Sequence, residues 1–385
     1  MSQLSRREFM RKSAIGASAA AFVSAGSARA YAANEKVRVA WIGYGGRATG
    51  LMHHMLEKCP DAAIVAMCDL RPDRVEAGLK AAERDKPKGY PVSEPLEFRK
   101  MLDKEKPDGV MIVTAPCDHA TVVVPTLEMG FNTFAEKPMD ITVEKIDAIT
   151  KAARASKGFY QIGTQRRCHP TYRAAMEAIH NGLLGRVTFM QGGWHWSGDP
   201  SGAHVARDGG RLTEQASHHM DVMSWVMKDA APESCVSMAL ADKNTEPNEQ
   251  SETKSATVFK FPGPALFSYT HLWILPGKFD KEILLAFGEK GAMDFNEALY
   301  TGRDEKEQRF GPAIGKAWDQ GTPDSLVHFV DNIKKGNKKP WANAETGRIC
   351  SLMCLMGRMA HVNAKKNAYE PRVVNWKELG STTDL

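Results

Sequence analysis

The sequence predicts an α/β protein in which a doubly wound parallel sheet is followed by an α+β domain with an open, largely antiparallel sheet. Three observations support this fold class. A glycine-rich turn joins an apolar strand to a helix over residues 37–58, strands and helices alternate as far as residue 163, and β-rich segments separated by polar turns occupy residues 235–288. With 385 residues the chain is long enough for two domains. We expect residues 34–165 to form the first and 166–385 the second, with a C-terminal helix that can pack back on the first.

The stretch VRVAWIGYGGRATG, residues 37–50, opens the first domain. Its apolar start has the length of one buried strand, and residues 47–58 can form a helix. In a Rossmann domain the first glycine of such a turn makes the bend, the second lets backbone N–H groups approach a pyrophosphate, and the helix N-terminus faces the phosphate charge. With Ala48 the pattern is G-x-G-x-x-A, and the alternative is a glycine-rich surface turn. The candidate cofactor contacts here are Gly43, Gly45, Gly46 and Arg47.

A second apolar run, residues 63–68, ends in Asp69. An acidic residue at this position of a dinucleotide-binding unit binds the ribose hydroxyls. The alternative is a helix cap before Pro72. Asp69 would repel a 2′-phosphate and so favours NAD, whereas Arg71 could accept that phosphate and leaves NADP open.

The alternation continues with strands at residues 110–114, 132–135 and 159–163 and helices at 96–102, 121–129 and 143–156. Ligands bind at the carboxyl ends of such strands. The loop after the third strand makes Pro116 and His119 candidate cofactor contacts, and the tripeptide Glu136-Lys137-Pro138 follows the next one.

Lys137 is the most informative residue of that tripeptide. At a strand end it can hydrogen-bond a substrate hydroxyl and the nicotinamide ribose, and a desolvated lysine can serve in proton transfer. Glu136 is a further candidate cofactor contact. Pro138 restricts Lys137 to an extended backbone and allows a cis peptide bond. The alternative is an exposed lysine at a strand end.

In the second domain, residues 163–170 lead into a helix over 171–181, and a strand runs through residues 187–191. The sequence Trp194-His195-Trp196 then suits a sugar, because indole rings stack on C–H faces and imidazole meets hydroxyls. The alternative is a strand with both tryptophans packed on one face. The candidate substrate contacts are Gln165, Arg166, His169, Tyr172, Trp194, His195, Trp196 and Asp221.

The segment from Gly209 to Asp221 is a second chemical centre, with a helix expected from Glu214 to Trp225 and Met227. Glu214, His218 and Asp221 would share one face of that helix. A carboxylate one turn before a histidine can hold it and tune its charge, and Asp221 would bind substrate or orient His218. The alternative for His218 is a capping or core histidine, and we expect His219 to be structural.

Taken together, G-x-G-G-R, C-D, T-A-P-x-x-x-H, E-K-P and H-H-x-x-D resemble the Gfo/Idh/MocA oxidoreductases, a family that includes glucose–fructose oxidoreductase and inositol dehydrogenase. The motifs span residues 37–221. The resemblance implies an NAD(P)-dependent oxidoreductase acting on a CH–OH group of a carbohydrate-like substrate, with His218 as general base beside Lys137. Glu214 stands where aspartate is common. The resemblance also implies a homodimer or homotetramer formed through the open face of the second sheet.

Two other functions stay open. Some relatives are redox-neutral glycosidases, in which bound NAD transiently oxidises a ring hydroxyl and elimination cleaves the glycosidic bond. A non-catalytic periplasmic sugar-binding protein is the third possibility.

Residues 1–33 resemble a twin-arginine (Tat) leader, with Arg6, Arg7 and Phe9, an Ala-rich stretch over 14–25 and Ala28-Arg29-Ala30. The alternative is a cytosolic N-terminal helix. The Tat machinery exports folded proteins, so we expect a periplasmic or otherwise exported enzyme that loads NAD in the cytosol and holds it tightly.

The composition of the chain limits the kinds of partner that the protein is expected to bind. The net charge of +5 includes Arg6, Arg7, Arg11 and Lys12 at the N-terminus, so the rest is nearly neutral and nucleic acid binding is not expected. No apolar run after the leader is long enough to span a bilayer. The seven cysteines show no CxxC or Cys/His spacing, so we expect buried thiols and no metal site.

Overall fold

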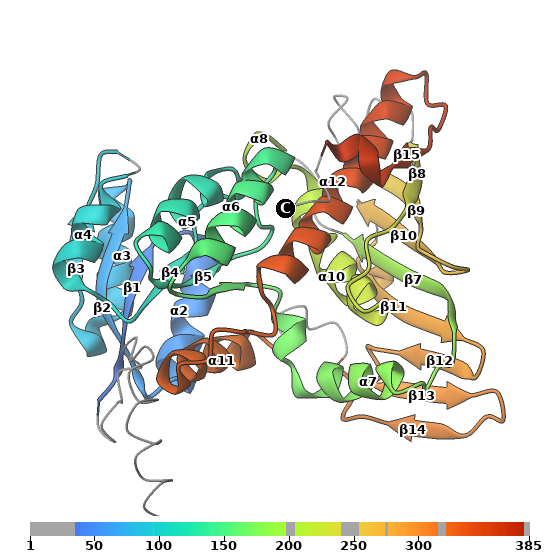
Figure 1. Ribbon diagram of the computed structural model, residues 1–385, viewed down its shortest axis with the longest axis horizontal. Coiled ribbons are helices and arrows are strands. Elements are labelled where there is room, and N and C mark those ends of the chain that lie inside the picture. Colours follow the sequence, from blue (N-terminus) through green and yellow to red (C-terminus); the bar gives the residue numbers. More distant parts are fainter. Residues whose placement is uncertain are drawn as a thin grey trace, which may run out of the picture.

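The structure of the protein is a computed structural model that describes residues 35–94, 96–197, 205–239, 254–273, 276–314 and 321–380. Residues 1–33, the predicted leader, lie outside these ranges. Two sheets stand side by side, the first in blue to green and the second in green to orange, with helices between them (Figure 1). No helix of the described residues is long and apolar enough to cross a membrane.

The first sheet has six parallel strands in the order β3-β2-β1-β4-β5-β6. This confirms the predicted doubly wound sheet. Because β1 pairs with both β2 and β4, the strand order reverses there, and ligands of such sheets bind at this reversal. Its elements are β1 (Val37–Ile42), α2 (Gly46–Lys58), β2 (Ala62–Asp69), α3 (Pro72–Ala81), β3 (Lys88–Pro91), α4 (Phe98–Glu105), β4 (Gly109–Ile112), α5 (His119–Glu128), β5 (Asn132–Ala135), α6 (Val143–Ala155) and β6 (Tyr160–Ile162).

The second sheet has nine strands in the order β14-β13-β12-β11-β7-β10-β9-β8-β15. Only β7 and β10 pair in parallel among the described strands of this sheet, so the predicted largely antiparallel sheet is confirmed. Its strands are β7 (Val187–Trp196), β8 (Ser234–Ala239), β9 (Lys254–Lys260), β10 (Leu266–Trp273), β11 (Lys281–Gly288), β12 (Gly291–Asp294), β13 (Leu299–Gly302), β14 (Glu307–Arg309) and β15 (Val374–Asn375).

Further helices lie on the side of this sheet that is turned toward the first sheet, and α10 and α12 contact its strands (Figure 1). They are η3 (Gln165–Cys168), α7 (Pro170–His180), α8 (Val205–Asp208), α9 (Arg211–Glu214), α10 (Ser217–Val226) and α12 (Ala344–Lys366). Helix α12 contacts both α6 and β8 and therefore ties the two sheets together.

Helix α11 (Thr322–Lys335) comes from the C-terminal part of the chain but packs on α2 and β1. Leu326, Phe329 and Val330 join the apolar core of the first sheet. Phe329 meets Phe134 and Phe159 edge-on, with ring centroids 5.8 and 5.6 Å apart. With α12 on the other side, the C-terminal helices hold the two sheets in a fixed relation across the space between them.

Candidate active site

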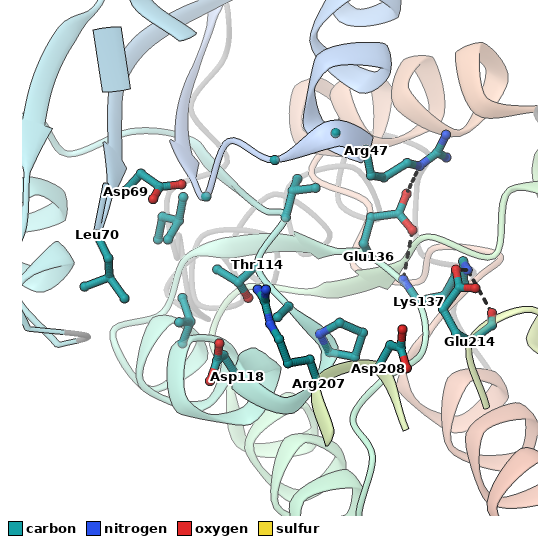
Figure 2. Close-up of a pocket in the computed structure, with 18 of the residues that line it drawn as sticks. Arg47, Asp69, Leu70, Thr114, Asp118, Glu136, Lys137, Arg207, Asp208 and Glu214 are labelled. Carbon is teal, nitrogen blue, oxygen red and sulfur yellow. Dashed lines mark hydrogen bonds and ion pairs between the residues drawn. The ribbon is translucent and has the colours of Figure 1, made fainter. Parts of the chain in front are cut away.

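A cavity of about 1230 Å³ lies between the two sheets, at the carboxyl ends of β1, β2, β4 and β5. Its far wall comes from β7, α8, α9 and α10. Figure 2 shows side chains from both sides pointing into this space. The sequence-predicted residues that line it are Gly43, Gly45, Gly46, Arg47, Asp69, Arg71, Pro116, Glu136, Lys137, Trp194, Glu214 and His218.

One end of the cavity is formed by the glycine turn between β1 and α2. Gly43 has a φ of +85°, and a Cβ there would lie 2.7 Å from the carbonyl oxygen of Val113. Only glycine fits this position. Gly45 precedes the first residue of α2 and supplies no capping side chain, so the first N–H groups of the helix stay available for an anion.

Asp69 fixes this turn to the end of β2. Its carboxylate accepts hydrogen bonds from the backbone N–H groups of Tyr44, at 2.7 Å, and Arg71, at 2.9 Å. It also lines the cavity, where a ribose would lie in this kind of sheet. The Arg71 guanidinium pairs at 2.7 Å with the exposed Asp73. Leu70 and Arg74 line the cavity beside them and were missed, because a strand-end leucine and a helical arginine carry no distinctive sequence signal.

His119 does not reach the cavity. It is fully buried at the start of α5, and its Nδ1 lies 2.8 Å from the carbonyl oxygen of Pro138. The direct cofactor contact that the sequence predicted for His119 is therefore wrong. Its ring faces inward and supports the turn that carries Lys137.

Lys137 lines the cavity and belongs to a chain of ionic and hydrogen-bond contacts (Figure 2). Arg47 Nε donates to Glu136 Oε1 at 2.9 Å, and the other oxygen of Glu136 accepts the N–H of Lys137 at 3.0 Å. Lys137 Nζ then donates to Glu214 Oε1 at 2.5 Å and to the Glu214 carbonyl at 2.8 Å. The Lys137–Pro138 peptide bond is cis. The ammonium is thus held between the two sheets.

The prediction of a single helix from Glu214 to Trp225 and Met227 is wrong. Helix α9 ends at Glu214, and α10 begins at Ser217. In a continuous helix the Glu214 carbonyl would accept the N–H of His218, but it accepts from Lys137 Nζ and the Ser217 hydroxyl instead. Glu214 consequently pairs with Lys137, and the expected one-face alignment of Glu214, His218 and Asp221 is lost.

His218 lines the cavity and is only 6% exposed. Its ring stacks on Trp194, with centroids 5.9 Å apart and planes inclined by 24°. Burial, followed by the charges of Lys137 and Arg166, lowers the pKa of His218 well below its usual value. The imidazole is therefore neutral at neutral pH and able to accept a proton.

Glu214, unlike His218, is charged. Burial is the largest single effect and would raise the pKa of its carboxyl, but the charge and hydrogen bond of Lys137, together with the charges of Arg211 and Arg47, outweigh burial and lower the pKa. Glu214 is ionised, and it compensates the charge of Lys137 beside a neutral histidine.

Four predicted substrate contacts on η3 and α7 lie behind the cavity wall. The Arg166 guanidinium pairs with Glu282 and donates to the His218 carbonyl at 3.3 Å, so it supports α10. Gln165 is buried, and His169 caps α7 by accepting the N–H of Thr171 at 3.2 Å. Tyr172 stacks on Phe295 at 5.7 Å. None of the four lines the cavity in the described structure, so the predicted direct contacts are wrong.

The three aromatic residues of the predicted sugar-binding segment separate. Strand β7 continues through Trp196, so alternation places Trp194 and Trp196 on the face toward the cavity and His195 on the opposite face. His195 Nε2 lies 2.8 Å from Thr270 Oγ1 there. Trp194 lines the cavity, whereas Trp196 is 40% exposed beyond it. The prediction for His195 is wrong, since a one-residue step along a strand reverses its face.

Asp221 is a core residue. Its carboxylate pairs at 2.7 Å with Arg167, and only 1% of it is exposed. Burial raises the pKa of Asp221 to about 6, although Arg167 opposes the shift. The prediction that Asp221 meets substrate or His218 is therefore wrong. His219 is fully buried, as expected for a structural residue.

A glycine turn, an acidic residue after the second strand, and a lysine and a neutral histidine in one cavity define a dinucleotide-dependent oxidoreductase class. Comparison with protein families agrees. Residues 37–164 match the model described as "Oxidoreductase family, NAD-binding Rossmann fold", and residues 172–294 match "GFO/IDH/MocA C-terminal domain". The chain belongs to this family, and its first sheet is the NAD-binding Rossmann fold of the family.

Several proteins are similar along part or all of the chain. Myo-inositol 2-dehydrogenase of Thermotoga maritima is 22% identical over 356 residues, covering 89% of this chain and 99% of that one. Scyllo-inositol 2-dehydrogenase (NAD(+)) of Bacillus subtilis is 24% identical, covering 50% and 54%. A glycosyl hydrolase family 109 protein of Stenotrophomonas maltophilia is 26% identical, covering 52% and 46%. The chain thus spans about half the length of the last two relatives.

Among solved structures, myo-inositol dehydrogenase from Lactobacillus casei, in complex with NAD(H) and myo-inositol, shares the fold with a TM-score of 0.70. It is 19% identical, and the match covers 88% of this chain and 97% of that one.

Proposed function

We propose that the protein oxidises a hydroxyl of a sugar, cyclitol or glycoside with NAD as the hydride acceptor. One observation carries this proposal: a neutral His218 and a charged Lys137 face the same cavity as the glycine turn. The cyclitol dehydrogenases among the similar proteins support the substrate class.

The cavity fits NAD. The Gly43 turn and the uncapped start of α2 would hold the pyrophosphate, and Asp69 would hold a ribose. When bound, NAD supplies the nicotinamide carbon that accepts a hydride. His218 Nε2 or Nδ1 removes the proton of the substrate hydroxyl, and the Lys137 ammonium donates to the same oxygen as negative charge develops on it. Glu214 keeps Lys137 in place.

Replacing either residue tests these roles. We expect His218→Ala and Lys137→Ala each to lower turnover by about 10²–10⁴-fold, the usual contribution of general acid–base catalysis. Bound nucleotide, measured after denaturation, should be retained. His195→Ala is the matched control, because it removes a histidine on the far face of β7, and it should keep its activity. Full activity in either active-site variant would contradict the roles of His218 and Lys137. If the unmodified protein binds sugars but turns none of them over, it is a sugar-binding protein and not an enzyme.

A redox-neutral glycosidase is the second candidate, and the family 109 relative favours it. Both reactions need the same proton transfer at His218. The products separate them, because the glycosidase releases free sugar with no net NADH whereas the dehydrogenase yields a ketone.

We further propose that residues 1–33 direct Tat export and that the enzyme keeps its NAD in the periplasm. The twin arginines and the A-x-A sequence support this. A reporter fused to residues 1–33 should be exported, and Arg6→Lys with Arg7→Lys should block it. Denatured mature protein should release NAD, and pure apo-protein that needs millimolar NAD would contradict tight retention.

The outer face of the second sheet supports a proposal that the protein forms a homodimer or homotetramer. Exposed or half-buried apolar residues from neighbouring strands share this face, including Phe189, Leu266, Phe287, Leu285 and Met238. Such a patch is typical of an interface. Light scattering should give a multiple of the monomer mass, and Phe189→Asp should reduce it.

A further inference from the structure

The wall of the cavity formed by the second domain contains an arginine that the mechanism above does not use. Arg211 is the first residue of α9, and it lines the cavity together with Gln215 and His218. The glycine turn that would hold pyrophosphate belongs to the opposite domain. Arg211 therefore lies at the substrate end of the cavity.

The guanidinium of Arg211 is held against an aromatic ring. It lies over the indole of Trp273, 4.5 Å from the ring centroid. Trp273 is itself only 6% exposed, and its indole N–H donates to Gln215 Oε1 at 3.3 Å. A guanidinium held over a buried ring in this way has a restricted position in the wall of the cavity.

The charge of Arg211 acts on Glu214, whose pKa it helps to lower, but the protein leaves a side-chain donor of Arg211 unused. Three nearby cations pair with carboxylates: Lys137 with Glu214, Arg47 with Glu136, and Arg166 with Glu282. Among the described residues, no carboxylate pairs with Arg211, and its Nε is buried without a hydrogen-bond partner. Buried donors in native proteins normally have partners, so a ligand atom is the natural acceptor here.

We propose that Arg211 binds a carboxylate of the substrate, so that the enzyme acts on a sugar acid such as a uronate rather than on a neutral polyol. The planar guanidinium offers two parallel N–H donors that match the two oxygens of a carboxylate. The hydroxyl to be oxidised then lies between His218 and Lys137, while the acidic group is held on the Trp273 side. This inference rests on the proposed function, which supplies the reaction used as its readout.

The experiment uses the enzyme with its bound cofactor and pairs of substrates that differ in one carboxylate: glucuronate against glucose, and galacturonate against galactose. We expect kcat/KM to favour the acid by at least about 10-fold, as for a charged hydrogen bond that is made or lost. Arg211→Gln should abolish this preference, mainly through KM, and Arg211→Lys should restore part of it. Arg186→Gln removes an exposed cation outside the cavity and should keep the preference.

Three results would overturn the proposal: a preference for the neutral sugar, a preference for the acid that survives Arg211→Gln, or a stronger preference for a sugar phosphate over the acid. If the wild-type enzyme oxidises no sugar, the proposed function fails, and calorimetry decides the inference separately. Glucuronate that binds wild-type protein and not Arg211→Gln supports the carboxylate site, whereas equal or absent binding contradicts it.

Discussion

At the scale of single residues, the site depends on two neighbouring groups with opposite charge states. Lys137 is cationic and fixed by Glu214, while His218 is neutral and packed against Trp194. A base must be unprotonated to accept a proton, and a cation beside the reacting oxygen favours the alkoxide. Burial in a low dielectric and the charge of Lys137 keep His218 in that form.

This arrangement predicts the pH dependence. Because the folded pKa of His218 lies below 6.5, its base form persists as the pH falls through 6.5. The acid limb of kcat/KM should therefore lie below pH 6.5. Glu214→Gln leaves the Lys137 ammonium without its carboxylate, so the limb should move to still lower pH. The measurement is kcat/KM from pH 4.5 to 9, with the exposed Glu289→Gln as control. An acid limb above pH 6.5 would count against His218 as the base.

At the scale of elements, two glycines of the β1–α2 turn have different roles, because Gly43 is required by the fold and Gly45 by the ligand. Gly43 bends the chain against β4, where no side chain fits. At Gly45 a Cβ would have only Arg74 Nη1 nearby, at 3.8 Å, so the protein itself has room for a methyl group there. A pyrophosphate bound against this turn would collide with that methyl group.

Two alanine variants distinguish these roles. Gly43→Ala should destabilise the protein by at least about 1–2 kcal/mol, because it forces a non-glycine residue to positive φ against a carbonyl oxygen. Gly45→Ala should cost at most about 1 kcal/mol of stability, as an N-cap change does, but should weaken NAD binding strongly. Thermal unfolding and nucleotide titration measure both. An equal loss of stability in the two variants would refute the distinction.

The elements also differ in how well they could be predicted from the sequence. Five of the six parallel strands, the turn at Gly43, Asp69 and Lys137 were predictable because apolar runs and glycine positions are local signals. The edge strand β3 was missed, since its sequence KGYP has no apolar run. The break between α9 and α10 was missed because its cause, Lys137, is 77 residues away in the chain.

The same limit explains the other errors in the site. Tyr172 and Asp221 were chosen for their chemistry, yet their partners Phe295 and Arg167 belong to other elements and hold them in the core. Arg211 was overlooked because its setting on Trp273 depends on tertiary structure.

At the scale of the whole molecule, several buried histidines make stability depend on pH. His119, His218, His219 and His271 are 6% exposed or less, and burial lowers the pKa of each, that of His271 to about 3. Below pH 6.5 the unfolded chain binds protons at these residues while the folded protein does not, so stability falls with pH. Two buried carboxyls have the opposite sign, Asp221 with its pKa raised to about 6 and Asp140 with its pKa also raised by burial, but they are two groups against four.

We therefore expect the melting temperature to fall between pH 7.5 and pH 5.5. Scanning calorimetry across this range measures it. His271→Gln removes one of the four buried imidazoles and should flatten the dependence, whereas the exposed His53→Gln should leave it unchanged. A melting temperature that rises as the pH falls would contradict the assignment of these histidines as neutral.

The central claim is that this cavity transfers a hydride from a carbohydrate-like hydroxyl to bound NAD. The most direct test mixes the enzyme, carrying its own cofactor, with an excess of substrate deuterated at the carbon to be oxidised. We expect deuterated NADH and one ketone for each NADH formed, and neither product with His218→Ala. Release of free sugar with no net NADH, or a ketone formed without deuterium in the nicotinamide, would contradict it.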